Sequence, residues 1–304
     1  MSATQVFKLE AGEAQALEQR LRQELPETSE WRRVDYARFA VKALGVSLVC
    51  YTSGKVVLQG KQTESFAARF LEGFRAEGPQ RSKASSDLSF EVTTVGSDEA
   101  GKGDYFGPLV VASVYAAPSR LDELKAMGVA DSKQLSDRRM YPIAERIEQE
   151  FACEVRMLMP PEYNEVWGRL RNVNHVLADL HTDAIAALLA ANDTEEVIVD
   201  RFAAESLVAT RLRRKVEVMP AKLVQVPRAE AHPVVAAASI VARVRFLEGL
   251  RQCEADSGTD LHKGAGAPVD VAIQRVFAIG GVELLRKVGK VHFKNSERVP
   301  GLRQ

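Results

Sequence analysis

Two adjacent carboxylates, Asp98 and Glu99, stand where a β-branched run meets a glycine-rich loop. The stretch 92–115 reads VTTVGSDEAGKGDYFGPLVVASVY, which predicts a strand, a loop and a second strand. Two negative charges at the end of a buried strand are costly unless a cation or a proton relieves them. Mg²⁺ binds through carboxylate oxygens and keeps water that can act as a nucleophile. The alternative is that Asp98 caps the turn and Glu99 points into solvent, and the pair alone does not decide between the two.

A further acidic candidate is Asp200, which closes the run EVIVD at 196–200. Three β-branched or aliphatic residues in sequence predict a central strand that is buried on both faces. An aspartate at the carboxyl end of such a strand is a poor core residue and a good site residue.

The elements that position these side chains fall into two predicted domains. Residues 1–76 are expected to form a small α+β domain, residues 77–88 a polar linker, and residues 89–304 a larger second domain. The first domain is predicted to contain a helix over 11–24, a strand over 33–43, a hairpin of 46–51 with 55–60, and a helix over 62–75.

The second domain is predicted to be a mixed sheet with helices on both faces. After the two strands of the opening stretch, strands are expected at 151–159, 196–200 and, as a short fifth strand, at 216–219. Helices are expected over 121–127, 139–150, 163–171, 175–191, from Pro233 onward, and over 269–287.

Composition excludes some classes of protein. The 304 residues carry 41 basic and 41 acidic side chains, so net charge gives no argument for a nucleic-acid partner. Basic runs at 211–215 and 286–303 give weak support for a polyanion. Three widely spaced cysteines argue against a disulfide framework and fit the reducing cytoplasm. No membrane span, signal peptide or obligate protein partner is indicated, and a cytoplasmic monomer is expected.

Four sequence strings resemble those of one family. GSDEAGKGDYFGP at 96–108 resembles the signature of ribonuclease HIII, a bacterial type 2 ribonuclease H. DSKQLS at 131–136, the tail around KVHF at 290–293 and the hairpin YTSGKVVLQGK at 51–61 are similar to further parts of that family. The resemblance covers nearly the whole chain. It implies a ribonuclease H-like α/β fold preceded by a substrate-gripping domain that resembles half of the TATA-binding protein.

The resemblance also implies an activity. Ribonuclease HIII is an endonuclease that hydrolyses the RNA strand of RNA/DNA hybrids by two-metal-ion catalysis, leaving 5′-phosphate and 3′-hydroxyl ends. With Mg²⁺ or Mn²⁺ as the cofactor, we expect metal binding to weaken in acid, because crowded carboxylates take up protons when no cation is bound. The metal ligands and catalytic residues that the resemblance implies are Asp98, Glu99, Asp200 and Glu230.

Selectivity for RNA requires recognition of the 2′-hydroxyl. Backbone amides of a glycine-rich loop can approach it closely, and a lysine on a loop can reach a phosphate. The expected substrate contacts are Gly101, Lys102, Gly103, Tyr105 as a sugar contact, Ser132 and Lys133.

Three alternatives remain open. A ribonuclease HII would cleave at single embedded ribonucleotides, and the extra amino-terminal domain, GDYFG and Glu230 argue against it. A hybrid-binding protein without catalytic activity would need a broken acidic set, and here the set is intact. Residues 1–76 could also be a generic cap or an oligomerisation module.

Overall fold

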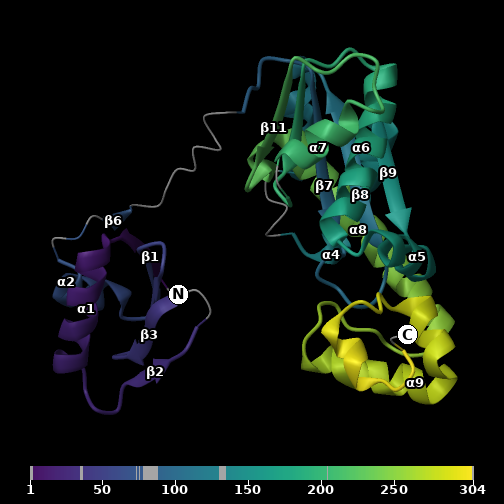
Figure 1. Cartoon of the computed structure of the whole chain (residues 1–304). Helices are drawn as coiled ribbons and strands as arrows, with labels where there is room; N and C mark the ends of the chain where they lie inside the picture. Colours follow the sequence, from purple (N-terminus) through teal and green to yellow (C-terminus); the bar gives the residue numbers. More distant parts are fainter. Residues whose placement is uncertain are drawn as a thin grey trace. The chain divides into compact units, whose positions relative to one another are not determined.

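The computed structural model describes residues 3–34, 37–72, 74, 76–77, 88–129, 135–203 and 205–302. The chain divides into two compact units, Met1–Lys83 and Ala84–Gln304, which we describe separately (Figure 1). Two of the expected substrate contacts, Ser132 and Lys133, lie outside the described residues.

The first unit contains a six-stranded antiparallel sheet in the order β2-β3-β4-β5-β1-β6. Its strands are β1 (Ala3–Lys8), β2 (Glu30–Arg32), β3 (Ala37–Ala43), β4 (Val46–Tyr51), β5 (Lys55–Gly60) and β6 (Ala76–Glu77). Alternate residues of β4 are buried, and they join a core with apolar side chains of helices α1 (Ala11–Glu24) and α2 (Thr63–Phe70). One face of the sheet is therefore covered by helices.

The predicted helix over 11–24 and the predicted hairpin are confirmed. The helix predicted over 62–75 ends at Phe70, and the strand predicted over 33–43 begins only at Ala37. Sequence reasoning missed strand β1, whose polar alternation is weak but which pairs along its whole length with β5.

The second unit contains a five-stranded mixed sheet in the order β11-β10-β7-β8-β9. Strand β10 lies parallel to β7 and β11, whereas β7, β8 and β9 form an antiparallel meander. These strands are β7 (Thr94–Ala100), β8 (Leu109–Ala116), β9 (Cys153–Leu158), β10 (Glu196–Asp200) and β11 (Lys222–Val226). The predicted mixed sheet is confirmed.

The fifth strand was predicted at the wrong place. Residues 216–219 form no strand, and Val218 is 80% exposed. The strand instead follows Pro220, where Val224 and Val226 pack with Ile198 of β10. The strand at 222–226 buries Val224 and Val226, whereas the earlier segment leaves Val218 exposed.

Helices cover both faces of this sheet (Figure 1). Helix α8 packs on β7 and β8 from one side, and α6 packs on β7, β8 and β9 from the other. Gly96 permits the close approach of α8, since a Cβ there would lie 2.6 Å from the backbone nitrogen of Val235. The helices are α3 (Leu121–Ala126), α4 (Asp137–Glu150), α5 (Pro160–Leu170), α6 (Val173–Ala191), α7 (Glu205–Leu212), α8 (Pro233–Ser257) and α9 (Ala267–Val288), with 3₁₀ turns η2 (Pro118–Arg120), η4 (Ala229–Ala231) and η5 (Lys294–Arg298).

The carboxyl-terminal segment ties down the loop between β7 and β8. The ammonium of Lys290 is fully buried and donates to the backbone carbonyls of Phe106, Gly107 and Pro108. The backbone N–H of Lys290 donates to the carbonyl of Tyr105 at 2.7 Å. No helix in the described part of the chain is long and apolar enough to cross a membrane.

Candidate active site

Four carboxylates from separate parts of the second unit line one pocket of about 520 Å³. Asp98 and Glu99 come from the last residues of β7, Asp200 closes β10, and Glu230 lies in the turn η4 before α8. Because β7 and β10 are parallel neighbours, their carboxyl ends meet at the same edge of the sheet. The outermost two, Asp98 and Glu230, lie 132 positions apart in the sequence, and the fold brings all four residues to one pocket.

The two neighbouring carboxylates of β7 point to opposite faces of the sheet. The strand continues to Ala100, so the side chains of Asp98 and Glu99 alternate along it. Asp98 shares the α8 side with Gly96 and receives a hydrogen bond from Ser239 of α8. Glu99 shares the α6 side with Ser97 and lies beside His181.

Burial and mutual repulsion raise the pKa values at this site. Burial, and then the neighbouring charge of Glu99, raise the pKa of Asp98 to about 7. Burial also raises the pKa of Asp200, and the charges of Glu230 and Glu99 add to the effect. The backbone N–H of Ala229 donates to Asp200 Oδ1 at 3.0 Å and opposes this shift. A bound cation would relieve the repulsion that these shifts record.

The donor set fits a hard divalent cation. All four side chains offer carboxylate oxygens, the ligands that Mg²⁺ and Mn²⁺ prefer. Within the described ranges, no three or more His, Cys, Asp or Glu side chains already form a cluster that could hold a metal ion.

Sequence reasoning missed His181, which holds Glu99. The imidazole has no exposed surface, and its Nε2 lies 3.3 Å from Glu99 Oε2. Its Nδ1 lies 2.7 Å from the hydroxyl of Ser97, and its ring stacks on Phe202 at 4.7 Å. The only sequence signal was a histidine on an apolar helix, which is more often a core residue than a site residue.

The loop after β7 is shaped by glycine. Gly101 has φ +90°, and a Cβ there would lie 2.2 Å from the carbonyl oxygen of Pro108. Gly103 faces open space, with nothing within 4 Å of a Cβ position. Lys102 lies between them, with Nζ 3.7 Å from Glu99 Oε1 and 3.5 Å from the carbonyl of Phe202. The loop thus presents backbone and one cation beside the carboxylates.

Comparison with known proteins identifies the family. The family model for ribonuclease HII matches residues 95–296, and a domain of unknown function (DUF3378) matches residues 4–83. Ribonuclease HIII of Protochlamydia amoebophila (strain UWE25) is 37% identical over 266 residues, covering 88% of this chain and 87% of that protein. Ribonuclease HIII of Streptococcus pyogenes serotype M49 is 31% identical and covers 98% of both chains. The chain belongs to the ribonuclease HIII family.

Solved structures agree with this assignment. The crystal structure of Bst-RNase HIII in complex with Mn²⁺ is 34% identical, covers 97% of both chains and has a TM-score of 0.65. The RNase HII of Archaeoglobus fulgidus, solved with PCNA, is 29% identical with a TM-score of 0.56 and covers 69% of this chain. Because the ribonuclease HIII relatives also cover the amino-terminal unit, the matches favour ribonuclease HIII over ribonuclease HII.

One expected contact of this ribonuclease HIII has to be corrected. Tyr105 has no exposed surface and packs in the main core, with its hydroxyl 3.2 Å from Ser296 Oγ. Burial raises its pKa to about 12. Its backbone N–H donates to Gly264, so Tyr105 anchors the loop and does not face a sugar.

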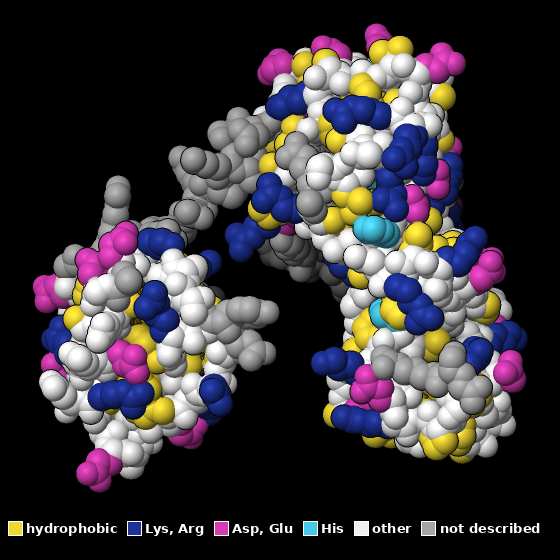
Figure 2. All heavy atoms as spheres, viewed as in Figure 1, with side chains coloured by type: hydrophobic (Ala, Val, Ile, Leu, Met, Phe, Trp, Pro, Cys, Tyr) yellow, Lys and Arg dark blue, Asp and Glu magenta, His cyan; other side chains and the backbone are white. Residues whose placement is uncertain are grey.

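Several cations of the basic runs of this ribonuclease HIII are paired or buried. Arg211 pairs with Asp179, and Lys215 pairs with Asp183. Lys290, in the second run, is buried inside the unit. On the face drawn in Figure 2, Lys and Arg side chains of the second unit form several separate groups, many of them beside acidic side chains. The surface charge there adds little to the case for a polyanion.

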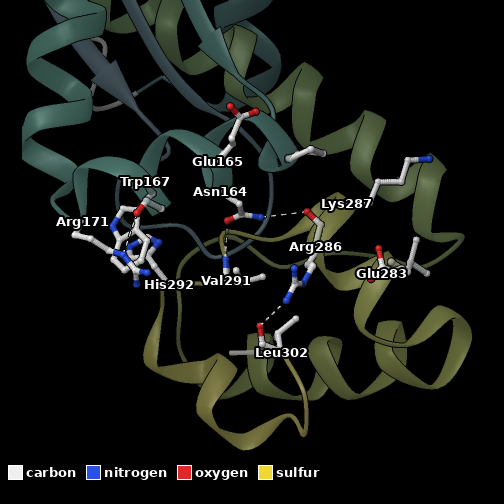
Figure 3. Close-up of a pocket in the computed structure, with 13 residues that line it drawn as sticks. Asn164, Glu165, Trp167, Arg171, Glu283, Arg286, Lys287, Val291, His292 and Leu302 are labelled. Carbon is white, nitrogen blue, oxygen red and sulfur yellow. Dashed lines mark hydrogen bonds between the residues drawn. The ribbon is translucent and has the colours of Figure 1, made fainter. Parts of the chain in front are cut away.

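A second pocket of this ribonuclease HIII, about 1210 Å³, lies between α5 and the carboxyl-terminal segment (Figure 3). Trp167 and His292 stack there at 5.0 Å, and the guanidinium of Arg171 lies 5.2 Å from the Trp167 ring centre. Asn164 donates to the carbonyls of Arg286 and Gly289 across it. None of the four carboxylates lines this pocket, so its size does not mark the chemistry.

Proposed function

We propose that this ribonuclease HIII hydrolyses the RNA strand of RNA/DNA hybrids with two divalent cations held by Asp98, Glu99, Asp200 and Glu230. The observation that carries the proposal is the pocket in which these four carboxylates meet. The family membership supplies the activity, and the Mn²⁺ complex of Bst-RNase HIII supports a divalent cation. The family match supports Mg²⁺ equally, because both ions accept an oxygen-only ligand set.

The residues of the chain divide the work as follows. The carboxylates hold the cations, which supply an activated water and stabilise the departing oxygen, giving 5′-phosphate and 3′-hydroxyl ends. The amides of the 101–103 loop approach the 2′-hydroxyl, since Gly101 and Gly103 add no side chain between backbone and ribose. The Lys102 side chain is 35% exposed beside Glu99, which supports a contact of this lysine with a phosphate. Ser132 and Lys133 are kept as proposed phosphate contacts on the family resemblance alone.

For the first unit we propose a role in gripping the substrate. Its antiparallel sheet, covered on one face by α1 and α2, supports the resemblance to half of the TATA-binding protein. Its other face is left to bind the hybrid. The free thiols of Cys50, Cys153 and Cys253 support a cytoplasmic location.

The experiment that tests the chemistry is cleavage by Asp200→Asn. Asparagine keeps an oxygen that can accept from Ala229 N–H, so the turn is preserved while a cation ligand loses its charge. We expect the rate on a long RNA/DNA hybrid to fall by about 10²-fold or more, as when a single charge-stabilising group is removed from an active site. Asp183→Asn, which removes a surface carboxylate paired with Lys215, is the matched control and should cleave normally.

The same assay separates the alternatives when it is run with Mg²⁺ and Mn²⁺ on two substrates. Wild-type cleavage at a single ribonucleotide embedded in DNA, as fast as on the long hybrid, would favour an activity like that of ribonuclease HII. An Asp200→Asn variant as active as wild type would overturn the proposed mechanism. Binding of the hybrid without cleavage under any metal would indicate a silent binding protein.

A further inference from the structure

Arg228 adopts a backbone conformation that arginine normally avoids. Its φ of 61° and ψ of 43° place it in the left-handed region, directly before η4. A residue with a side chain is strained at positive φ, whereas glycine adopts this conformation without strain. Among the described residues, the other non-glycine residues with a positive φ are Leu44 and Arg171.

The conformation itself serves the active site. It turns the chain from the end of β11 so that the next N–H, that of Ala229, donates to Asp200 Oδ1 and Glu230 enters the pocket. Glycine would make the same turn at lower cost. The backbone therefore explains the left-handed turn but not the choice of arginine.

Arg228 lines the same pocket as the four carboxylates, and its guanidinium carries a positive charge. Within the described part of the chain, no acceptor forms a hydrogen bond or ion pair with it. The two other arginines nearby are engaged, since Arg243 pairs with Asp137 at 3.2 Å and Arg201 donates to the carbonyl of Gln225 at 2.8 Å. Arg228 is an exposed residue whose charge is left available beside the carboxylates of this pocket.

We propose that Arg228 binds a phosphate of the RNA strand next to the scissile phosphate, which makes it a further substrate-binding residue of this site. The inference rests on the proposed function and deepens it. Carboxylates repel a polyanion, and the cations they hold neutralise only the phosphate that reacts. The neighbouring phosphate needs its own cation, and the planar guanidinium matches two phosphate oxygens with parallel N–H donors.

The test compares Arg228→Gly with Arg171→Gly. Both variants remove an exposed arginine from a left-handed position, and both relieve the same backbone strain. Arg171 lines the large pocket away from the carboxylates, so it serves as the control. Single-turnover cleavage of an RNA/DNA hybrid, measured against enzyme concentration in Mg²⁺, gives a half-saturation concentration and a maximal rate for each variant.

We expect Arg228→Gly to raise the half-saturation concentration about tenfold or more, with a smaller change in the maximal rate. The slope of log affinity against log salt should become less steep by about one. Arg228→Lys should restore the salt slope but only part of the affinity, because it offers one point charge in place of a planar pair of donors. Arg171→Gly should leave all of these quantities unchanged.

Several results would overturn the inference. An unchanged half-saturation concentration in Arg228→Gly would do so. An unchanged salt slope together with a lower Mg²⁺ requirement would also do so, because it would show that the arginine only offsets the charge of the carboxylates. If Arg228→Gly does not fold, Arg228→Asn, which tolerates the same conformation, takes its place. Loss of cleavage in Asp200→Asn beside a normal Arg228→Gly would refute this inference and leave the proposed function standing.

Discussion

His181 holds Glu99 from inside the protein. The imidazole Nε2 lies 3.3 Å from the Glu99 carboxylate, and the opposite ring nitrogen lies 2.7 Å from the hydroxyl of Ser97. The imidazole therefore bridges Ser97 and Glu99, two residues of β7 that share one face of the sheet. The side chains of Glu99 and Asp98 leave β7 on opposite faces of the sheet. The contact with His181 therefore sets the direction from which the Glu99 carboxylate reaches the pocket.

Replacing His181 should therefore weaken metal binding. We expect His181→Phe, which keeps the stacking on Phe202 but removes the ring nitrogen that contacts Glu99, to raise the Mg²⁺ concentration for half-maximal cleavage by about 10- to 100-fold. His181→Gln, which retains an N–H donor, should recover part of this loss, and the rate at saturating Mg²⁺ should change little. His175→Gln on the same helix is the control. Equal Mg²⁺ requirements in wild type and His181→Phe would show that His181 only fills space.

Gly96→Ala should separate β7 from α8. The new methyl group would lie 2.6 Å from Val235 N and 2.7 Å from Val234 C, which are backbone atoms that cannot turn aside. We expect a loss of about 1–3 kcal/mol in the free energy of unfolding, measured by urea denaturation. In Gly168→Ala the methyl group meets nothing within 4 Å in an exposed position of α5, so that variant should gain up to about 1 kcal/mol. A Gly96→Ala variant as stable as wild type would mean that α8 can shift freely.

The sequence predicted the sheet because its strands carry strong local signals. Residues 94–97, 109–114 and 196–199 are buried without a break, and the glycine loop between the first two strands marks a turn. Strand β11 was misplaced because Val216 and Val218 suit a strand equally well by propensity. Only the pairing with β10, a long-range contact, selects Lys222–Val226.

Site residues that lie in a sequence motif were predicted. Residues that only the packing of the fold brings to the site were missed. Asp98 and Glu99 stand in a distinctive string, whereas the contact of His181 with Glu99 joins residues 82 positions apart. Tyr105 was assigned to the substrate because its glycine-rich loop stands beside Asp98 and Glu99 in the sequence. In the structure the backbone of Tyr105 is hydrogen-bonded to Gly264 and to Lys290, and the tyrosine ring is buried.

Deletion of residues 1–76 tests the role of the first unit. Each unit has hydrophobic clusters of its own, so the shortened chain is expected to fold. If the unit supplies affinity, KM for a long hybrid should rise about tenfold or more while kcat changes little, because a tethered binding surface is lost. Adding residues 1–76 as a separate chain should not restore KM. A selective fall in kcat would instead place part of the chemistry in that unit.

The buried ammonium of Lys290 predicts a pH dependence of stability. Complete burial lowers its pKa to about 7, from an ordinary value of 10.5. Between these values the unfolded chain holds a proton that the folded chain lacks, so stability rises with pH across this window and falls as pH drops toward 7. The slope is about 1.4 kcal/mol per pH unit where the difference is one whole proton.

Urea denaturation of wild type and Lys290→Met between pH 7 and 10 measures this term. Methionine cannot titrate, so the stability of wild type relative to the variant should increase as pH rises. The variant also leaves the carbonyls of Gly107 and Pro108 without a donor, and this loss is expected at every pH. Lys287→Met, which removes an exposed lysine from the same segment, should keep the wild-type slope. Parallel stability curves for wild type and Lys290→Met would show that the three carbonyls hold the ammonium charged throughout. In that case the lysine secures the loop beside the carboxylates by charge alone.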